Sequence, residues 1–180
     1  MNPSAAGRVL AKTLWLSRSI TALDLSRAGM DDHAGAYMAR ALRHAESPIV
    51  KLDLDHNELG DRTCSSFAET LAFEGSKLRS LSLEGNDLGR DVVDGNRQRL
   101  SRDDDGIGQQ PGFERLTASL KHNSALSRLG LWRCGINRHA GTLLAQGVEE
   151  NTVLILVEVG QNDLEFEDER RIEVVHSIAR

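Results

Sequence analysis

The apolar residues of this chain recur in a fixed frame. Residues 49–59 and 78–88 share the spacing L-x-x-L-x-L-x-x-N-x-L, with Ile49 in the first place of one copy, and lie 29 residues apart. The same frame starts again at residues 20, 126 and 154. Its central part alternates apolar and polar residues, which is typical of a β-strand with one buried side. The pattern therefore predicts five strands within residues 20–164, beginning near residues 20, 49, 78, 126 and 154.

A second pattern alternates with the first and predicts helices. Apolar residues four positions apart lie on one face of a helix. Residues 10–14 have this spacing and precede the first strand, so residues 1–19 are predicted to form an N-terminal capping helix. Residues 165–180 begin with acidic residues and end in Arg180, an order that suits the helix dipole, and they predict a C-terminal helix. The same spacing recurs between the strands in residues 38–42, 67–71, 116–120 and 144–148.

The third and fourth frames are farther apart than the others. Leu78 and Leu126 are 48 residues apart, which predicts an insertion of about 20 residues around residues 91–112. A loop of that size is functional or disordered more often than structural. One strand and one helix cannot bury their apolar sides alone, whereas a stack of such units makes a continuous core. We therefore expect residues 1–180 to form a single α/β domain.

On these repeated residues the sequence resembles the leucine-rich repeat family, and specifically its ribonuclease-inhibitor-like subfamily. The resemblance implies a curved solenoid with one parallel sheet on the concave face and helices on the convex face. It also implies that the Asn place of each frame holds a small polar side chain, which bonds the turn backbone of neighbouring units. Ala28 departs from this rule in the first copy. The expected structural ladder is Asn57, Asn86, Cys134 and Asn162.

Composition and charge narrow the class of protein. The chain has 180 residues, of which 39% are apolar and 27% charged, and this is typical of a soluble globular domain. Its longest apolar runs are far shorter than a membrane span requires. The formal net charge of −5 argues against a general nucleic-acid binder. We therefore expect a cytoplasmic location, with no membrane and no nucleic acid among the partners.

Candidate catalytic and metal-binding residues are few. Cys64 falls in a small core-facing register and Cys134 in the ladder, so both are interpreted as structural. His33 and His139 share a register, but the units between them do not supply a histidine, which does not suit a metal site. Residues 101–112 fail the spacing of a calcium loop because the twelfth place is glycine. We expect no enzyme activity, no catalytic residues, no cofactor and no metal.

The outward positions of the strands are the more informative candidates. Side chains alternate along a strand, so the residues between the buried leucines point away from the core. These positions are acidic in the first copies. The acidic residues either keep the protein soluble or form a surface that binds a basic partner. Trp132 is predicted to face outward beside Gly160, with an apolar face and an adjacent gap, unless it packs on the insertion. The predicted partner-binding residues are Asp24, Asp53, Asp55, His56, Glu84, Arg128, Trp132, Arg133 and Glu158.

Together these features predict a non-catalytic protein–protein interaction module that uses its concave face and inserted loop. The family resemblance implies a scaffold or subunit of a larger intracellular assembly, with cytoskeletal and ciliary assemblies among the candidates. The expected partner is a protein or a large protein assembly with a basic surface. The alternative is a regulator or inhibitor of an enzyme, in the manner of ribonuclease inhibitor or of the GTPase-activating proteins of this subfamily.

Overall fold

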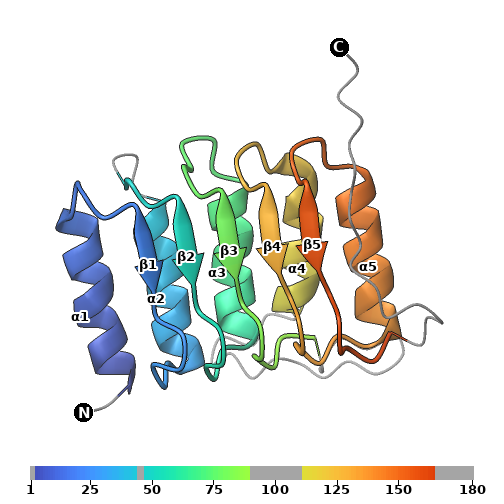
Figure 1. The fold of residues 1–180 in the computed structure, drawn as a ribbon, viewed down its shortest axis with the longest axis horizontal. Coiled ribbons are helices and arrows are strands. Elements are labelled where there is room, and N and C mark those ends of the chain that lie inside the picture. Colours follow the sequence, from blue (N-terminus) through green and yellow to red (C-terminus); the bar gives the residue numbers. More distant parts are fainter. Residues whose placement is uncertain (1–2, 44–46, 90–110, 165–180) are drawn as a thin grey trace.

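The chain alternates strands and helices along its length (Figure 1). A computed structural model describes residues 3–43, 47–89 and 111–164. Each strand starts two residues after its sequence frame. The strands are β1 (Ala22–Asp24), β2 (Lys51–Asp53), β3 (Ser80–Ser82), β4 (Arg128–Gly130) and β5 (Leu156–Glu158). The helices are α1 (Pro3–Leu16), α2 (Asp32–Leu42), α3 (Asp61–Leu71), α4 (Gly112–Ser119) and α5 (Arg138–Glu149), with a 3₁₀ turn at Leu120–His122.

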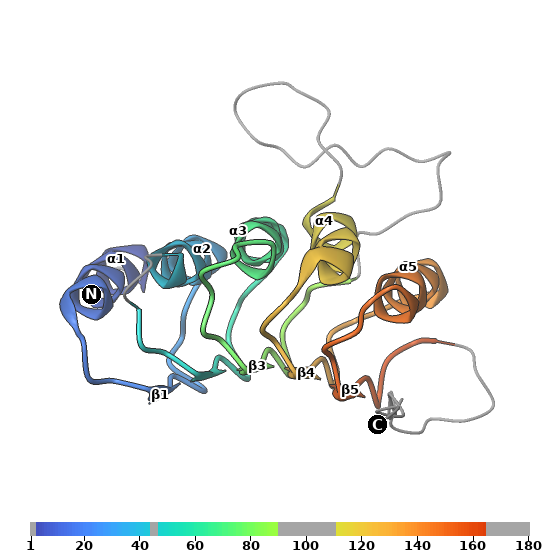
Figure 2. The ribbon, with the colours of Figure 1, turned by 90° about the horizontal axis from the view of Figure 1, so that it is seen from above.

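The five strands form one parallel sheet in chain order. Parallel neighbours need a long connection, and the helices provide it. The helices α1 to α5 lie on one side of the sheet and form an outer row that curves around it (Figure 2). The fold class α/β is thus confirmed. The register places the same position of every unit side by side, as in the row Leu23, Leu52, Leu81, Leu129 and Val157.

The core lies between the sheet and the helices and runs through every unit. The apolar residues of the frames point into it, for example Leu52, Leu54 and Leu81, each at most 1% exposed. Phe67 of α3 and Phe113 of α4 close it from the helix side and are fully buried. Each unit thus buries its apolar side against its neighbours, which is why the spacing of the leucines is so regular. Among the described residues, no helix is long and apolar enough to cross a membrane.

The Asn places join each unit to its neighbour through backbone hydrogen bonds. The side chain of Asn86, 3% exposed, accepts from the Leu59 N–H at 3.1 Å. Its amide donates to the carbonyl oxygens of Leu54 at 3.1 Å and Leu83 at 2.8 Å. Asn57 and Asn162 make equivalent bonds to the preceding unit. The thiol of Cys134, in the same place, donates to the Leu83 carbonyl oxygen at 3.2 Å.

The predicted ends of the chain and the insertion fall partly outside the described residues. Residues 1–2, 90–110 and 165–180 lie outside them, and with these the predicted C-terminal helix and most of the predicted loop. Gly112, at the C-terminal end of the predicted loop, is the first residue of α4. Its backbone N–H there donates to the carboxylate of Asp61 at the start of α3, which anchors the helix to the preceding unit.

Candidate functional site

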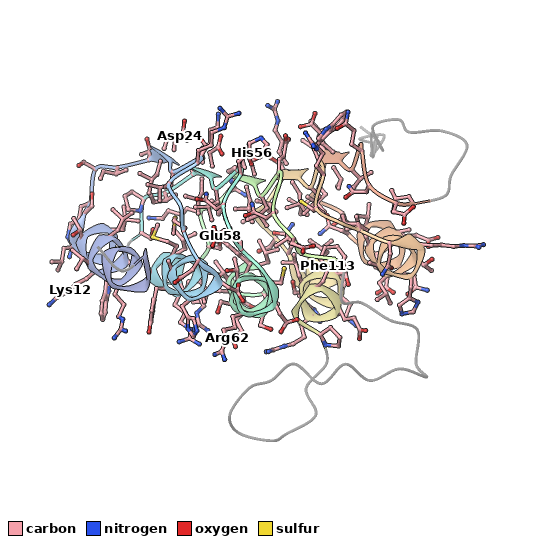
Figure 3. All side chains as sticks on the ribbon, turned by 90° about the horizontal axis from the view of Figure 1, so that it is seen from below. Lys12, Asp24, His56, Glu58, Arg62 and Phe113 are labelled. Atoms are coloured by element: carbon pink, nitrogen blue, oxygen red, sulfur yellow. The ribbon has the colours of Figure 1, made fainter. Side chains whose placement is uncertain are left out.

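The exposed side of the sheet carries two rows of polar side chains. We call this surface the sheet face; it consists of the outward residues of the strands and of the turn after each strand. The register sets Asp24 of β1 beside Asp53 of β2. Asp24 and His56 project on this side, whereas Lys12 and Arg62 project from the helices on the opposite side (Figure 3). Asp24, Asp53 and His56, three of the predicted partner-binding residues, therefore lie on the sheet face (Figure 3).

The carboxylates of this surface are held in place by the backbone of the turns. Asp24 Oδ1 accepts from the Ser26 N–H at 2.9 Å and from its hydroxyl at 2.7 Å. Asp53 Oδ1 accepts from the Asp55 N–H at 3.0 Å, and Asp55 Oδ1 accepts from the Glu84 N–H at 2.8 Å. Aspartate favours such turns because its short side chain reaches the backbone two residues on. The carboxylates of Asp24, Asp53 and Asp55 are therefore each held by a hydrogen bond from a turn.

Burial, hydrogen bonds and neighbouring charges shift the pKa values of these acids. Partial burial raises the pKa of the Glu84 carboxyl, and the negative charges of Asp55, Glu158 and Asp53 raise it further. Burial also raises the pKa of Asp55, although its hydrogen bonds with Ser82 and Glu84 oppose the shift. In contrast, hydrogen bonds from Ser26 lower the pKa of the exposed Asp24. The middle of the sheet face thus holds negative charge that would be relieved by a cation.

Substitution of Glu84 by glutamine removes a carboxylate whose charge is disfavoured by burial and by neighbouring acids, so it is expected to stabilise the fold at neutral pH. The gain should be less than ~1 kcal/mol, because solvent partly screens the site. The folded state holds the Glu84 proton to a higher pH than the unfolded chain does. This contribution to stability is therefore present below the ordinary pKa of 4.5 and is lost as pH rises through the raised value. Thermal melts of both proteins between about pH 4 and pH 7 measure the difference.

The matched control for this substitution is Glu149→Gln, which removes a carboxylate from an exposed position of α5. The advantage of the Glu84 variant over the wild type should grow with pH, whereas that of the control should stay constant. A constant difference for both variants would contradict the raised pKa of the Glu84 carboxyl.

Basic side chains lie at the borders of the acidic row. Lys51 at the start of β2 and Arg128 at the start of β4 are exposed. His56 and Arg133 occupy equivalent turns in the left-handed region, with φ of 54° and 53°. The imidazole of His56 lies against Gly85 of the next turn. Lys51 is close enough to Asp24 for its positive charge to help lower the pKa of that carboxyl.

Trp132 differs from its prediction in one respect. It lies on the sheet face and is half-buried. A Cβ atom on Gly160 would lie 2.1 Å from Cζ3 of the Trp132 ring, so the indole rests directly on that glycine. The expected open gap beside the ring was wrong, because the ring itself fills the space that the missing side chain leaves. Trp132 is thus partly exposed on the sheet face and packs against Gly160 with part of its ring.

The two cysteines do not have the character of nucleophiles. Both are free thiols and both are buried. Burial raises the pKa of Cys64 well above its ordinary value and that of Cys134 to about 12. Since the thiolate is the reactive form, both side chains stay protonated at neutral pH. In the described part of the chain, no group of three or more His, Cys, Asp or Glu residues could hold a metal ion.

Comparison with known proteins gives structural neighbours. The leiomodin-1 actin-binding site 2 matches with a TM-score of 0.59 at 15% sequence identity, over 86% of this chain and 75% of that chain. The tropomodulin C-terminal domain of Caenorhabditis elegans matches with a TM-score of 0.60 at 14% identity, over 87% of this chain and 82% of that chain. No protein-family model and no curated protein matches the sequence. At these identities the likeness shows a shared fold.

These neighbours correct the family that the leucine spacing suggested. The assignment to the leucine-rich repeat family and its ribonuclease-inhibitor-like subfamily was wrong, since the matching structures are leiomodin and tropomodulin domains and no family model matches. The physical reason is that regular leucines report burial between a parallel sheet and a row of helices. That packing requirement sets the spacing without identifying a family.

Proposed function

We propose that this chain is a non-catalytic protein-interaction module of the actin cytoskeleton, which binds a basic surface of a protein partner through its sheet face. The observation that carries the proposal is the row of acidic side chains formed by Asp53, Asp55 and Glu84. Turn hydrogen bonds orient the carboxylates of Asp53 and Asp55, and the charges of these two residues add to the effect of burial in raising the pKa of the Glu84 carboxyl. Acids arranged in this way raise the energy of the free surface, and a basic partner removes that repulsion.

Actin is the partner that we propose. The support is the likeness in fold to the leiomodin-1 structure described as an actin-binding site. A role as a scaffold or subunit of a cytoskeletal assembly, in the cytoplasm, follows from this proposal. The alternative of an enzyme regulator rested on the family resemblance that the neighbours correct, so we do not carry it forward.

The absence of enzyme activity is part of the same proposal. It is supported by the protonated, buried state of Cys64 and Cys134. The acids of the sheet face support it as well, because turn backbone groups engage Asp24, Asp53 and Asp55 as hydrogen-bond acceptors. These hydrogen bonds hold the three carboxylates in place as surface charges.

The proposal can be tested by titrating pyrene-labelled monomeric actin with the wild-type chain. The same titration is made with the double variant Asp53→Asn/Glu84→Gln. Asparagine keeps an acceptor for the Asp55 N–H, so the turn is retained while charge is removed. We expect the double variant to bind about tenfold more weakly and with a shallower dependence on salt, because complementary charge acts mainly on association. Trp132→Ala should weaken binding by about 2 kcal/mol, as truncation of an interface tryptophan does.

The matched control is Glu149→Gln/Glu150→Gln, which removes the same charge from exposed positions at the end of α5. It should bind as the wild type does. Equal weakening by both double variants would overturn the sheet face as the binding surface. No binding by the wild-type chain would overturn actin as the partner.

A further inference from the structure

A groove lies on the opposite side of the molecule, between α1 and α2. Arg8, Lys12 and Trp15 line it from α1, and Tyr37 and Arg40 line it from α2. We call it the α1–α2 groove; its volume is about 590 Å³. Lys12 projects away from the sheet (Figure 3), so this surface is separate from the sheet face.

Small residues between the two helices explain why the groove exists. Gly7 lies so close to α2 that a Cβ atom on it would be 2.3 Å from the Ala34 Cβ atom. Farther along the pair, Ala11 and Ala41 line the groove. The large side chains of Trp15 and Tyr37 border these alanines, and Trp15 is 57% exposed. The result is a concave apolar floor between aromatic side chains.

The charge of the groove is opposite to that of the chain as a whole. The chain has a net charge of −5, yet all the charged residues that line the groove are basic: Arg8, Lys12, Arg40 and Arg43. Arg43 forms an ion pair with Glu69, so we assign the basic rim to Arg8, Lys12 and Arg40. The guanidinium of Arg8 lies 5.2 Å from the centroid of the Tyr37 ring, which holds this cation at the rim. The exposed apolar residues Val9 and Leu16 lie on the same helix, with 67% and 75% of their surface accessible.

We propose that the α1–α2 groove binds an acidic amphipathic segment of a partner protein. Apolar side chains of the segment occupy the floor between Trp15 and Tyr37. Its carboxylates pair with Arg8, Lys12 and Arg40 at the rim, where a charge-assisted hydrogen bond is stronger than a neutral one. A protein segment is favoured over a lipid surface because the apolar floor is concave, and an amphipathic helix fills such a groove whereas a bilayer lies across it. This site is independent of the function proposed for the sheet face.

The test uses the full chain and a fluorescein-labelled amphipathic peptide with glutamates on one helical face and leucine and phenylalanine on the other. Anisotropy titration should show saturable binding. Lys12→Ala/Arg40→Ala, which changes two exposed side chains, should weaken it about tenfold. Trp15→Ala should weaken it by at least the same factor, with the thermal melt of the variant as a check of folding. The control Lys77→Ala/Lys121→Ala removes two exposed cations outside the groove and should leave binding unchanged.

Three results would overturn the proposal. One is equal binding of a peptide with glutamine in place of every glutamate, since charge would then play no part. Another is equal loss of binding in the two double variants. The third is the absence of peptide binding by the wild-type chain, with or without binding to vesicles of phosphatidylserine and phosphatidylcholine; vesicle binding alone would assign the surface to lipid.

Discussion

Replacing Asn86 with alanine is expected to lower the free energy of unfolding by about 3 kcal/mol, since the change leaves several buried backbone groups without a partner. The Asn86 side chain bonds the Leu59 N–H and the carbonyl oxygens of Leu54 and Leu83. It is 3% exposed, so water cannot replace these bonds without opening the turn. Urea unfolding followed by circular dichroism measures the loss from the shift of the midpoint at constant slope.

Cys134→Ala is the matched comparison because Cys134 occupies the same place one unit later. Its thiol donates to the carbonyl oxygens of Leu83 at 3.2 Å and Trp132 at 3.6 Å. A thiol is a weak donor, so we expect a loss of about 1 kcal/mol. Equal losses for the two variants would mean that the amide bonds between units contribute no more than packing does.

The periodicity of the sequence was enough to predict the α/β class and the approximate position of every strand. The reason is that Leu52, Leu81 and Leu129 occupy equivalent, almost fully buried places. A buried position accepts few residue types, so burial is visible in the sequence. The family was beyond this reasoning, because any parallel sheet packed on a row of helices imposes the same spacing.

The candidate site was less predictable than the fold. Alternation along the strands placed Asp53, Asp55 and Glu84 on one surface, because the outward direction follows from the pleat alone. The contact of the Trp132 ring with Gly160 depends on a side-chain rotamer, about which the sequence pattern says nothing. The sequence frames also predicted that these carboxylates lie near one another. They did not predict the turn hydrogen bonds that orient Asp53 and Asp55.

The α1–α2 groove was missed for a different reason. Arg8, Lys12 and Trp15 are spaced at four and three residues in α1. This spacing is typical of one exposed face of a helix. Its depth depends on the close approach of Gly7 to Ala34, a contact between different units. One sequence signal could have indicated the groove. Basic residues lie on one face of α1, and another basic residue, Arg40, lies on α2 in the next repeat.

The start of α3 is held by a residue from the preceding unit. The N-cap residue of α3, Gly60, has no side chain with which to accept a hydrogen bond. Asp32, in the first turn of α2, provides the side-chain acceptor that Gly60 lacks. Its Oδ1 accepts from the N–H groups of Gly60 and Thr63, both at 2.8 Å, and its Oδ2 accepts from the Arg62 N–H at 2.9 Å. A negative charge therefore satisfies the free N–H groups at the positive end of the next helix.

Asp32→Ala is expected to lower the free energy of unfolding by about 2 to 3 kcal/mol, because three N–H groups lose a charged acceptor in a partly buried place. Asp32→Asn retains one acceptor oxygen and should lose about half as much. The control is Asp31→Ala: Asp31 caps its own helix by accepting from the Ala34 N–H at 2.8 Å, and its removal should cost about 1 kcal/mol. Urea unfolding of the three variants ranks them. If Asp32→Ala is no more harmful than Asp31→Ala, the cap between units contributes no more than an ordinary helix cap, and the coupling of α2 to α3 must come from apolar packing alone.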